Sequence, residues 1–113
     1  MATSERDASD AVSLGDDEDF RDVIDATDVA LVEFYTEWCG TCQRLKPTLS
    51  AIAADTDATV LLVDIEAHLE TAIEYGAQRS PTFVLFAEGR PVKQVSGNRT
   101  EGELRALIEE YGA

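Results

Sequence analysis

Short runs of hydrophobic residues alternate with stretches of mixed polarity along the chain, and the runs predict buried strands. Residues 29–35 read Val-Ala-Leu-Val-Glu-Phe-Tyr, a nearly continuous apolar segment of the kind that forms a central strand covered on both faces. The other expected strands are Ala11–Leu14 at an edge, Thr59–Ile65, Thr82–Phe86 and Val92–Val95. The last two are joined as a hairpin around Glu88-Gly-Arg90, so the sheet is expected to end in an antiparallel pair.

Between the strands, apolar residues recur at the three- and four-residue spacing of helices. The first predicted helix has Asp16 as its N-cap and runs to about Ala26, with further acids in its first turn. The other helices are expected from Cys39-Gly-Thr-Cys42 to about Asp55, from His68 to Tyr75, and from Thr100 to Glu110. Strands and helices therefore alternate through most of the chain.

This order predicts the α/β class, with a central mixed sheet of about five strands, largely parallel, flanked by four helices. At 113 residues the chain has room for one domain, and it shows neither an internal repeat nor a linker. Residues 1–10 are small and polar, and we expect them to form a disordered acidic tail. The domain should then occupy residues 11–113.

Charge adds a constraint on partners and surroundings. The chain has 23 acidic against 9 basic residues, a formal net charge of -14, so its surface should repel the phosphates of nucleic acids. Only Lys46 and Lys93 are lysines, and an acid-rich, lysine-poor surface resembles proteins of halophiles, in which salt screens the self-repulsion. No apolar run approaches the ~20 residues that cross a bilayer, and the N-terminal residues lack the pattern of a secretory signal. We therefore expect a cytoplasmic protein without a membrane partner.

The two cysteines of the chain form a single motif, Cys39-Gly-Thr-Cys42. A purely structural disulfide would be weak, because closing so short a loop contributes only about 2 kcal/mol in the chain-entropy model. A structural zinc site needs four ligands, and only His68 would be available as a further nitrogen or sulfur donor. A redox-active dithiol fits best, because the motif lies where a buried strand turns into a helix.

That placement explains why the two thiols should differ. The free amides and the dipole at the helix start favour an anion, so they stabilise a thiolate on Cys39. A thiolate is the form that attacks a disulfide sulfur. Cys42 lies one turn into the helix, where it is expected to be more buried and to stay protonated until it displaces Cys39 from the mixed disulfide. Gly40 is small enough for a substrate backbone to approach.

The residues around the cysteines resemble those of the thioredoxin family. Trp38-Cys-Gly-Thr-Cys42 is similar to the family's Trp-Cys-Gly-Pro-Cys, and Glu37 before the tryptophan is common there. Ser80-Pro81-Thr82 looks like the loop whose cis-proline faces the dithiol in this family. Three further positions match as well: Phe86, Gly89 and Gly97. The resemblance extends from about residue 11 to the C-terminus.

The resemblance implies a thioredoxin fold and a thiol–disulfide oxidoreductase that reduces disulfides of client proteins. In that role Cys39 is the nucleophile, Cys42 is the resolving thiol, and Glu33 moves the proton on and off Cys42. The residues implied to frame the substrate groove are Trp38, Gly40, Thr41, Ser80, Pro81 and Gly97. The resemblance further implies a monomer without a cofactor or metal of its own, which serves electron transport and cell redox homeostasis. A separate, flavin-dependent thioredoxin reductase would re-reduce it.

Two departures from the family pattern bear on the chemistry. Thr41 stands where the family has proline. Because proline would restrict the first helical turn and a threonine hydroxyl can donate to the Cys39 thiolate, we expect a somewhat less reducing potential. Glu33 stands where the family has a buried aspartate, and Leu62 stands where it has the neighbouring lysine, so no cation is expected beside Glu33. Burial should then raise the pKa of Glu33, to about 7 to 9.

Three alternatives are compatible with the sequence. Two chains that each donate Cys39 and Cys42 would suffice for a zinc or iron–sulfur site. A redox-inert binding module would keep the fold for partner contact alone. An oxidase or isomerase would differ from a reductase only in the potential of the dithiol, which the sequence does not determine.

Overall fold

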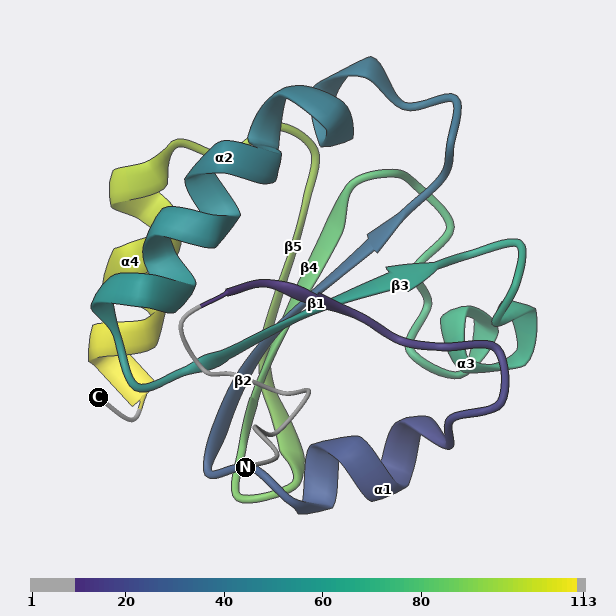
Figure 1. The fold of residues 1–113 in the computed structure, drawn as a ribbon, viewed down its shortest axis with the longest axis horizontal. Coiled ribbons are helices and arrows are strands. Elements are labelled where there is room, and N and C mark those ends of the chain that lie inside the picture. The colour runs from purple at the N-terminus through teal and green to yellow at the C-terminus, as the bar shows by residue number, and fades with distance from the viewer. Residues whose placement is uncertain (1–9, 112–113) are drawn as a thin grey trace, which may run out of the picture.

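The expected alternation of strands and helices is present in the computed structural model, which describes residues 10–111 (Figure 1). The strands are β1 (Val12–Ser13), β2 (Val29–Tyr35), β3 (Thr59–Asp64), β4 (Thr82–Ala87) and β5 (Arg90–Ser96). The helices are α1 (Phe20–Asp25), α2 (Gly40–Asp55), α3 (Leu69–Glu74) and α4 (Glu101–Tyr111). The tail predicted over residues 1–10 lies, apart from its last residue, outside the described residues.

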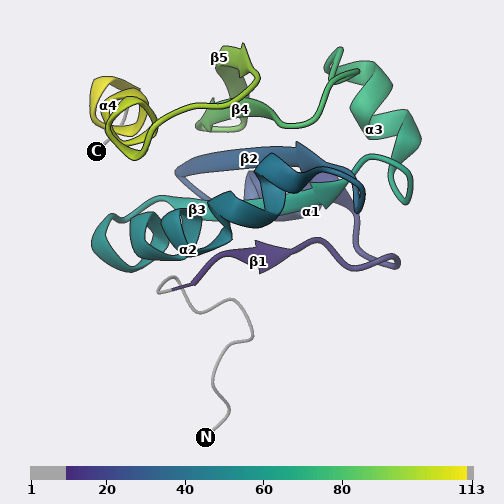
Figure 2. The ribbon, with the colours of Figure 1, turned by 90° about the horizontal axis from the view of Figure 1, so that it is seen from above.

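The five strands form one mixed sheet in the order β1-β3-β2-β4-β5, which Figure 2 shows from above. The pairs β1–β3 and β2–β3 are parallel, whereas β4 is antiparallel to both β2 and β5. The expectation of a largely parallel sheet was therefore wrong for β4. The segment that contains α3 leaves the chain at the end of the sheet where β2 and β3 finish, instead of crossing back to the end where they begin. As a result β4 begins beside the end of β2, with Thr82 opposite Phe34.

Each face of the sheet carries its own hydrophobic core. Helices α1 and α3 cover one face and α2 and α4 cover the other (Figure 1). Successive residues of β2 point to opposite faces, so Val32 and Phe34 pack under α1 whereas Leu31 packs under α2. This alternation directs Glu33, which lies between Val32 and Phe34, toward the side of α2.

The start of α1 differs from the sequence prediction. Its N-cap is Asp19, whose side chain accepts from Arg21 N–H at 2.8 Å, so the expected cap Asp16 was wrong. The residues before the helix form a turn instead, because Glu18 both donates its N–H to the Gly15 carbonyl and accepts from Gly15 N–H through its carboxylate. With these groups occupied by each other, the helix begins one turn later.

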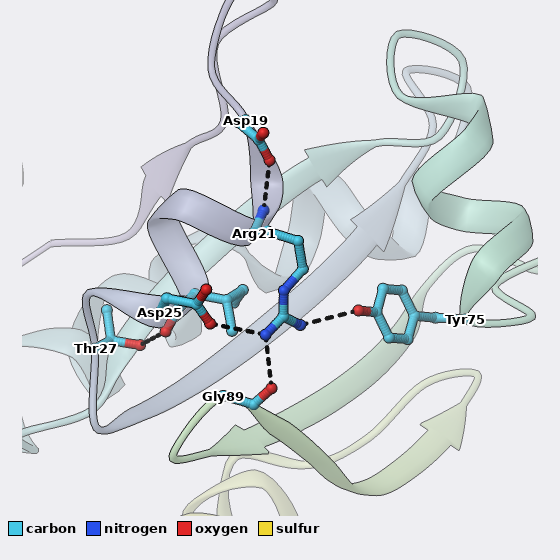
Figure 3. Close-up of polar contacts among 7 residues, drawn as sticks. Asp19, Arg21, Asp25, Thr27, Tyr75 and Gly89 are labelled. Atoms are coloured by element: carbon cyan, nitrogen blue, oxygen red, sulfur yellow. Dashed lines mark hydrogen bonds and ion pairs between the residues drawn. The ribbon is translucent and has the colours of Figure 1, made fainter.

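Arg21 connects three elements at the end of the sheet where β2 begins (Figure 3). Its guanidinium donates to Asp25 on the same helix at 2.7 Å and to the Tyr75 hydroxyl beyond α3 at 3.2 Å. It also donates to the Gly89 carbonyl in the β4–β5 turn, at 2.9 Å. Gly89 has φ of +82°, a conformation that favours glycine. One side chain thus holds α1, the end of α3 and the hairpin turn together.

Candidate active site

The two cysteines lie where β2 gives way to α2, and the connection between these two elements is at the top of Figure 1. Cys39 is the N-cap of α2 and Cys42 lies within the first turn, and the two are joined in a disulfide with Cα atoms 5.3 Å apart. Cys39 Sγ accepts from Cys42 N–H at 3.0 Å. The amide of the first helical turn therefore faces the sulfur that would carry negative charge in the reduced protein. This arrangement stabilises a thiolate.

The two sulfurs differ in access to solvent. Cys39 is half-buried, whereas the side chain of Cys42 is only 1% exposed because it faces the core between α2 and the sheet. An incoming disulfide can reach the first sulfur without rearrangement of the second. This asymmetry suits an attacking thiol at Cys39 and a resolving thiol at Cys42.

Glu33 is the buried carboxyl group beneath the dithiol helix. It is 2% exposed and pairs with Leu62 and Phe83 on the neighbouring strands, and its buried Oε2 atom has no hydrogen-bond partner among residues 10–111. Desolvation raises the pKa of Glu33 to about 7, and the positive charge of Lys46 limits the rise. The expectation of burial was right, but the expectation that no cation lies near was wrong, because α2 supplies Lys46 where β3 has Leu62.

Hydrogen bonds join the dithiol loop to the loop that contains Pro81. Ser80-Pro81 has a cis peptide bond, Pro81 is buried, and its carbonyl accepts from Gly97 N–H at 2.8 Å. The hydroxyls of Thr36 and Ser80 lie 3.2 Å apart, and the Thr36 carbonyl accepts from Cys39 N–H. Three of the predicted groove residues, Ser80, Pro81 and Gly97, are thus tied to the dithiol.

Thr36 was not among the site residues predicted from the sequence. Its partner becomes evident only from the antiparallel register of β2 and β4, in which Phe34 lies opposite Thr82. Extending that register by two residues places Thr36 opposite Ser80. Thr36 could therefore be identified only once β4 was known to run antiparallel to β2, whereas the sequence pattern predicted a parallel strand.

The remaining predicted groove residues lie on the exposed side of the dithiol. Trp38 is 80% exposed, so it is not a packing residue of the core. Thr41 Oγ1 accepts from Arg44 Nη2 at 3.2 Å, which leaves the hydroxyl hydrogen free to donate elsewhere. A Cβ atom on Gly40 would lie 3.4 Å from Arg44 Nη1, so the absent side chain leaves space that the guanidinium partly occupies.

His68 does not join the cysteines. It occupies the N-cap position of α3, but its side chain makes no capping hydrogen bond, and its Nε2 atom is buried without a partner. Within residues 10–111, no group of three or more His, Cys, Asp or Glu side chains is arranged to hold a metal ion. Over the same residues, none of the helices has the length and apolar character needed to cross a membrane.

Comparisons with known proteins match nearly the full length of the chain to one family. The family model for thioredoxin matches residues 11–110. The thioredoxin of Chlamydia muridarum is 36% identical over 101 residues, covering 88% of this chain and 98% of its own, and that of Mycobacterium tuberculosis is 34% identical over 106 residues. Among solved structures, a mutant thioredoxin from Halobacterium salinarum superposes with a TM-score of 0.88 at 36% identity, covering 99% of this chain and 97% of its own. Schistosoma mansoni thioredoxin gives a TM-score of 0.83 at 25% identity, covering 92% and 97%.

Proposed function

The chain belongs to the thioredoxin family, and from that premise we propose that Cys39 and Cys42 reduce client disulfides as attacking and resolving thiols. The protein is a dithiol oxidoreductase that acts on protein disulfides. The observation that carries the assignment of roles is the contrast between a half-buried Cys39 at the helix N-cap and a Cys42 that is 1% exposed one turn later.

The reaction has two exchange steps. The Cys39 thiolate attacks one sulfur of the client disulfide, which forms a mixed disulfide and releases the other client sulfur as a thiolate that takes up a proton. Cys42 then loses its proton and attacks Cys39 Sγ, which forms the Cys39–Cys42 disulfide and releases the second client thiol. Two electrons pass from the dithiol to the client, and the protein ends in the disulfide form that the structure displays.

Glu33 is the group proposed to accept the Cys42 proton in the second step. It lies on the α2 side of β2, and its Oε2 atom has no hydrogen-bond partner that would compete for a proton. A pKa of about 7 lets the carboxyl group both take and return a proton near neutral pH. The longer glutamate side chain should bring its oxygens within direct reach of the reduced Cys42 thiol.

The client segment is proposed to bind across the dithiol. Trp38, Gly40 and Thr41 would form one side of the groove, and Ser80, Pro81 and Gly97 the other. The Thr36–Ser80 and Pro81–Gly97 hydrogen bonds support this arrangement, because they hold the second side in register with Cys39. A groove fixed in advance lowers the entropy lost when an extended segment binds.

Regeneration and surroundings complete the proposal. A separate, flavin-dependent thioredoxin reductase would return the electrons, and the chain would act as a cytoplasmic monomer without a cofactor of its own. The net charge of -14 and the structural likeness to the Halobacterium salinarum protein support the proposal that this protein functions at high salt.

We expect the melting temperature to climb as potassium chloride is raised into the molar range, because salt screens the repulsion among the acidic side chains. A melting temperature that does not change with salt would contradict this part of the proposal.

Thiol trapping tests the assigned roles. Cys42→Ser should accumulate mixed disulfides with client proteins, because the resolving thiol is gone, whereas Cys39→Ser should abolish turnover and trap nothing. In the reduced protein, Cys39 should be alkylated much faster than Cys42 at neutral pH. Equal alkylation rates, or mixed disulfides formed through Cys42, would overturn the assignment.

A further inference from the structure

In the part of the chain that the structure describes, three arginines are neutralised by carboxylates. Arg21 pairs with Asp25, Arg99 with Glu103, and Arg105 with both Asp55 and Glu101, at 2.7 to 3.8 Å. The chain has 23 acidic residues for 9 basic ones, so a cation on this surface is expected to lie close to some carboxylate. Three other arginines of the described residues, Arg44, Arg79 and Arg90, form no ion pair.

Arg44, in the first turns of α2, is an arginine of this kind. Its guanidinium is held by a neutral group, the Thr41 hydroxyl at 3.2 Å, and no carboxylate in the described part of the chain forms an ion pair with it. The same guanidinium lies over Gly40, where an added Cβ would be 3.4 Å from Nη1. Arg44 thus presents a full positive charge beside the two residues that separate the cysteines.

The other charges around the dithiol are unevenly placed. Lys46 lies two residues beyond Arg44, is exposed, and makes no ion pair with a described residue. Across the dithiol, the exposed Arg79 precedes Ser80, whose hydroxyl contacts Thr36. The exposed acid Glu37 precedes Trp38 in the loop before the dithiol, and it forms no ion pair with Arg44. Arg44 and Lys46 are thus exposed cations near the start of α2 that no described carboxylate neutralises.

We propose that Arg44, positioned by Thr41, is a subsite that binds a carboxylate side chain next to the disulfide of the client. This inference rests on the proposed function and adds a substrate class to it, namely disulfides flanked by aspartate or glutamate. A guanidinium presents a planar fork of donors that matches a carboxylate, and the bond to Thr41 restricts the arginine before the client arrives. Thr41, where the family has proline, supplies the hydroxyl that makes this possible.

The test uses two peptides that are identical except for the residues beside a single disulfide, glutamate in one and lysine in the other. The fully reduced protein is mixed with each peptide at low ionic strength, and the second-order rate constant of disulfide reduction is measured. The glutamate peptide should react about two- to fivefold faster, the range expected for one exposed ion pair. The preference should shrink as sodium chloride is added, because salt screens exposed charges.

Three variants locate the effect. Arg44→Gln should remove most of the preference, and Arg44→Lys should retain part of it. Arg90→Gln changes the net charge equally, but Arg90 is the first residue of β5, at the end of the sheet where β2 begins, so this variant should keep the preference. Equal rates for the two peptides, or equal losses in Arg44→Gln and Arg90→Gln, would overturn the subsite while leaving disulfide reduction intact. If neither peptide is reduced, the proposed function itself fails, and the subsite with it.

Discussion

The two ends of the central sheet treat their charged groups in opposite ways. At the end where β2 begins, Arg21 has a carboxylate, a hydroxyl and a carbonyl as partners, and the Tyr75 ring that it reaches packs against Phe86 with centroids 5.3 Å apart. At the end where β2 finishes, the buried Glu33 has an oxygen with no hydrogen-bond partner among the described residues, and no described acid pairs with Arg44. Arg21 is thus held by three hydrogen bonds, whereas Arg44 is held by the Thr41 hydroxyl alone.

This division has a physical rationale. A buried, unpartnered carboxyl group costs stability, because it loses its hydration without gaining a hydrogen bond. Such a group is tolerated only where other contacts stabilise the fold enough to offset this cost. The aromatic cluster beside Arg21 supplies such contacts, since Phe20 packs against Phe34, Tyr75 and Phe86. The comparison predicts that changes at the two ends will affect stability and reactivity separately.

The largest expected effect is at Glu33. An unfolded glutamate has a pKa of about 4.3, and in the folded protein the pKa is about 7, so the folded state holds a proton that the unfolded state has released. Stability therefore falls as pH rises from about 4 to 7, and Glu33→Gln removes this loss. We expect the variant to gain about 3 kcal/mol in free energy of unfolding at pH 7 and little at pH 4.

Denaturant titrations of the oxidised Glu33→Gln protein at the two pH values measure this difference. The same variant should slow the resolving step more than the first attack on the client, because only the second step transfers a proton to Glu33. An equal gain at both pH values, with an unchanged resolving rate, would show that Glu33 is an ordinary strand residue.

A smaller effect, of opposite kind, is expected at Arg21. Arg21→Met should lower the free energy of unfolding by about 1 to 2 kcal/mol, because three hydrogen bonds are lost from a partly exposed side chain while its aliphatic length is kept. The rates of both exchange steps should remain as in the wild type. A change in exchange rate comparable to the change in stability would refute the separation of the two ends.

The smallest predicted change concerns Lys46, whose charge lowers the pKa of Glu33 against the effect of burial. Lys46→Gln should raise that pKa further and move the pH midpoint of the resolving step upward, and Lys46→Arg should restore it. Lys93→Gln is the matched control, since it removes the chain's other lysine from the exposed strand β5. A midpoint that shifts equally in the two Gln variants would reflect net charge alone.

The features predicted correctly from the sequence are those decided by neighbouring residues. The apolar run of β2, the cysteine pair at the start of α2 and the burial of Glu33 each follow from a few consecutive side chains. The prediction of Asp16 as the N-cap of α1 was wrong, because Asp16 and Asp19 are both suitable capping residues. The hydrogen bonds between Gly15 and Glu18 decide that the helix begins after Asp19.

Other features depended on residues distant in sequence. The direction of β4 follows from the end of the sheet at which the segment containing α3 leaves the chain, and the Thr36–Ser80 contact follows from that direction. Lys46 approaches Glu33 from another element, and it was overlooked because the cation was expected on β3 at position 62. Arg44 is a different case, since its bond to Thr41 spans only three residues but its significance depends on whether a described acid pairs with it in the fold.

The edges of the sheet affect how the protein behaves when many copies are crowded together. A long, flat edge strand exposes a row of amides and carbonyls that can template aggregation. Here β1 at one edge has only two residues, and β5 at the other contains Pro91, which lacks an N–H, beside a register shift opposite Leu85 and Phe86. Neither of these edges offers a second copy a regular strand to extend, so concentrated solutions of the folded protein should resist growth into fibres.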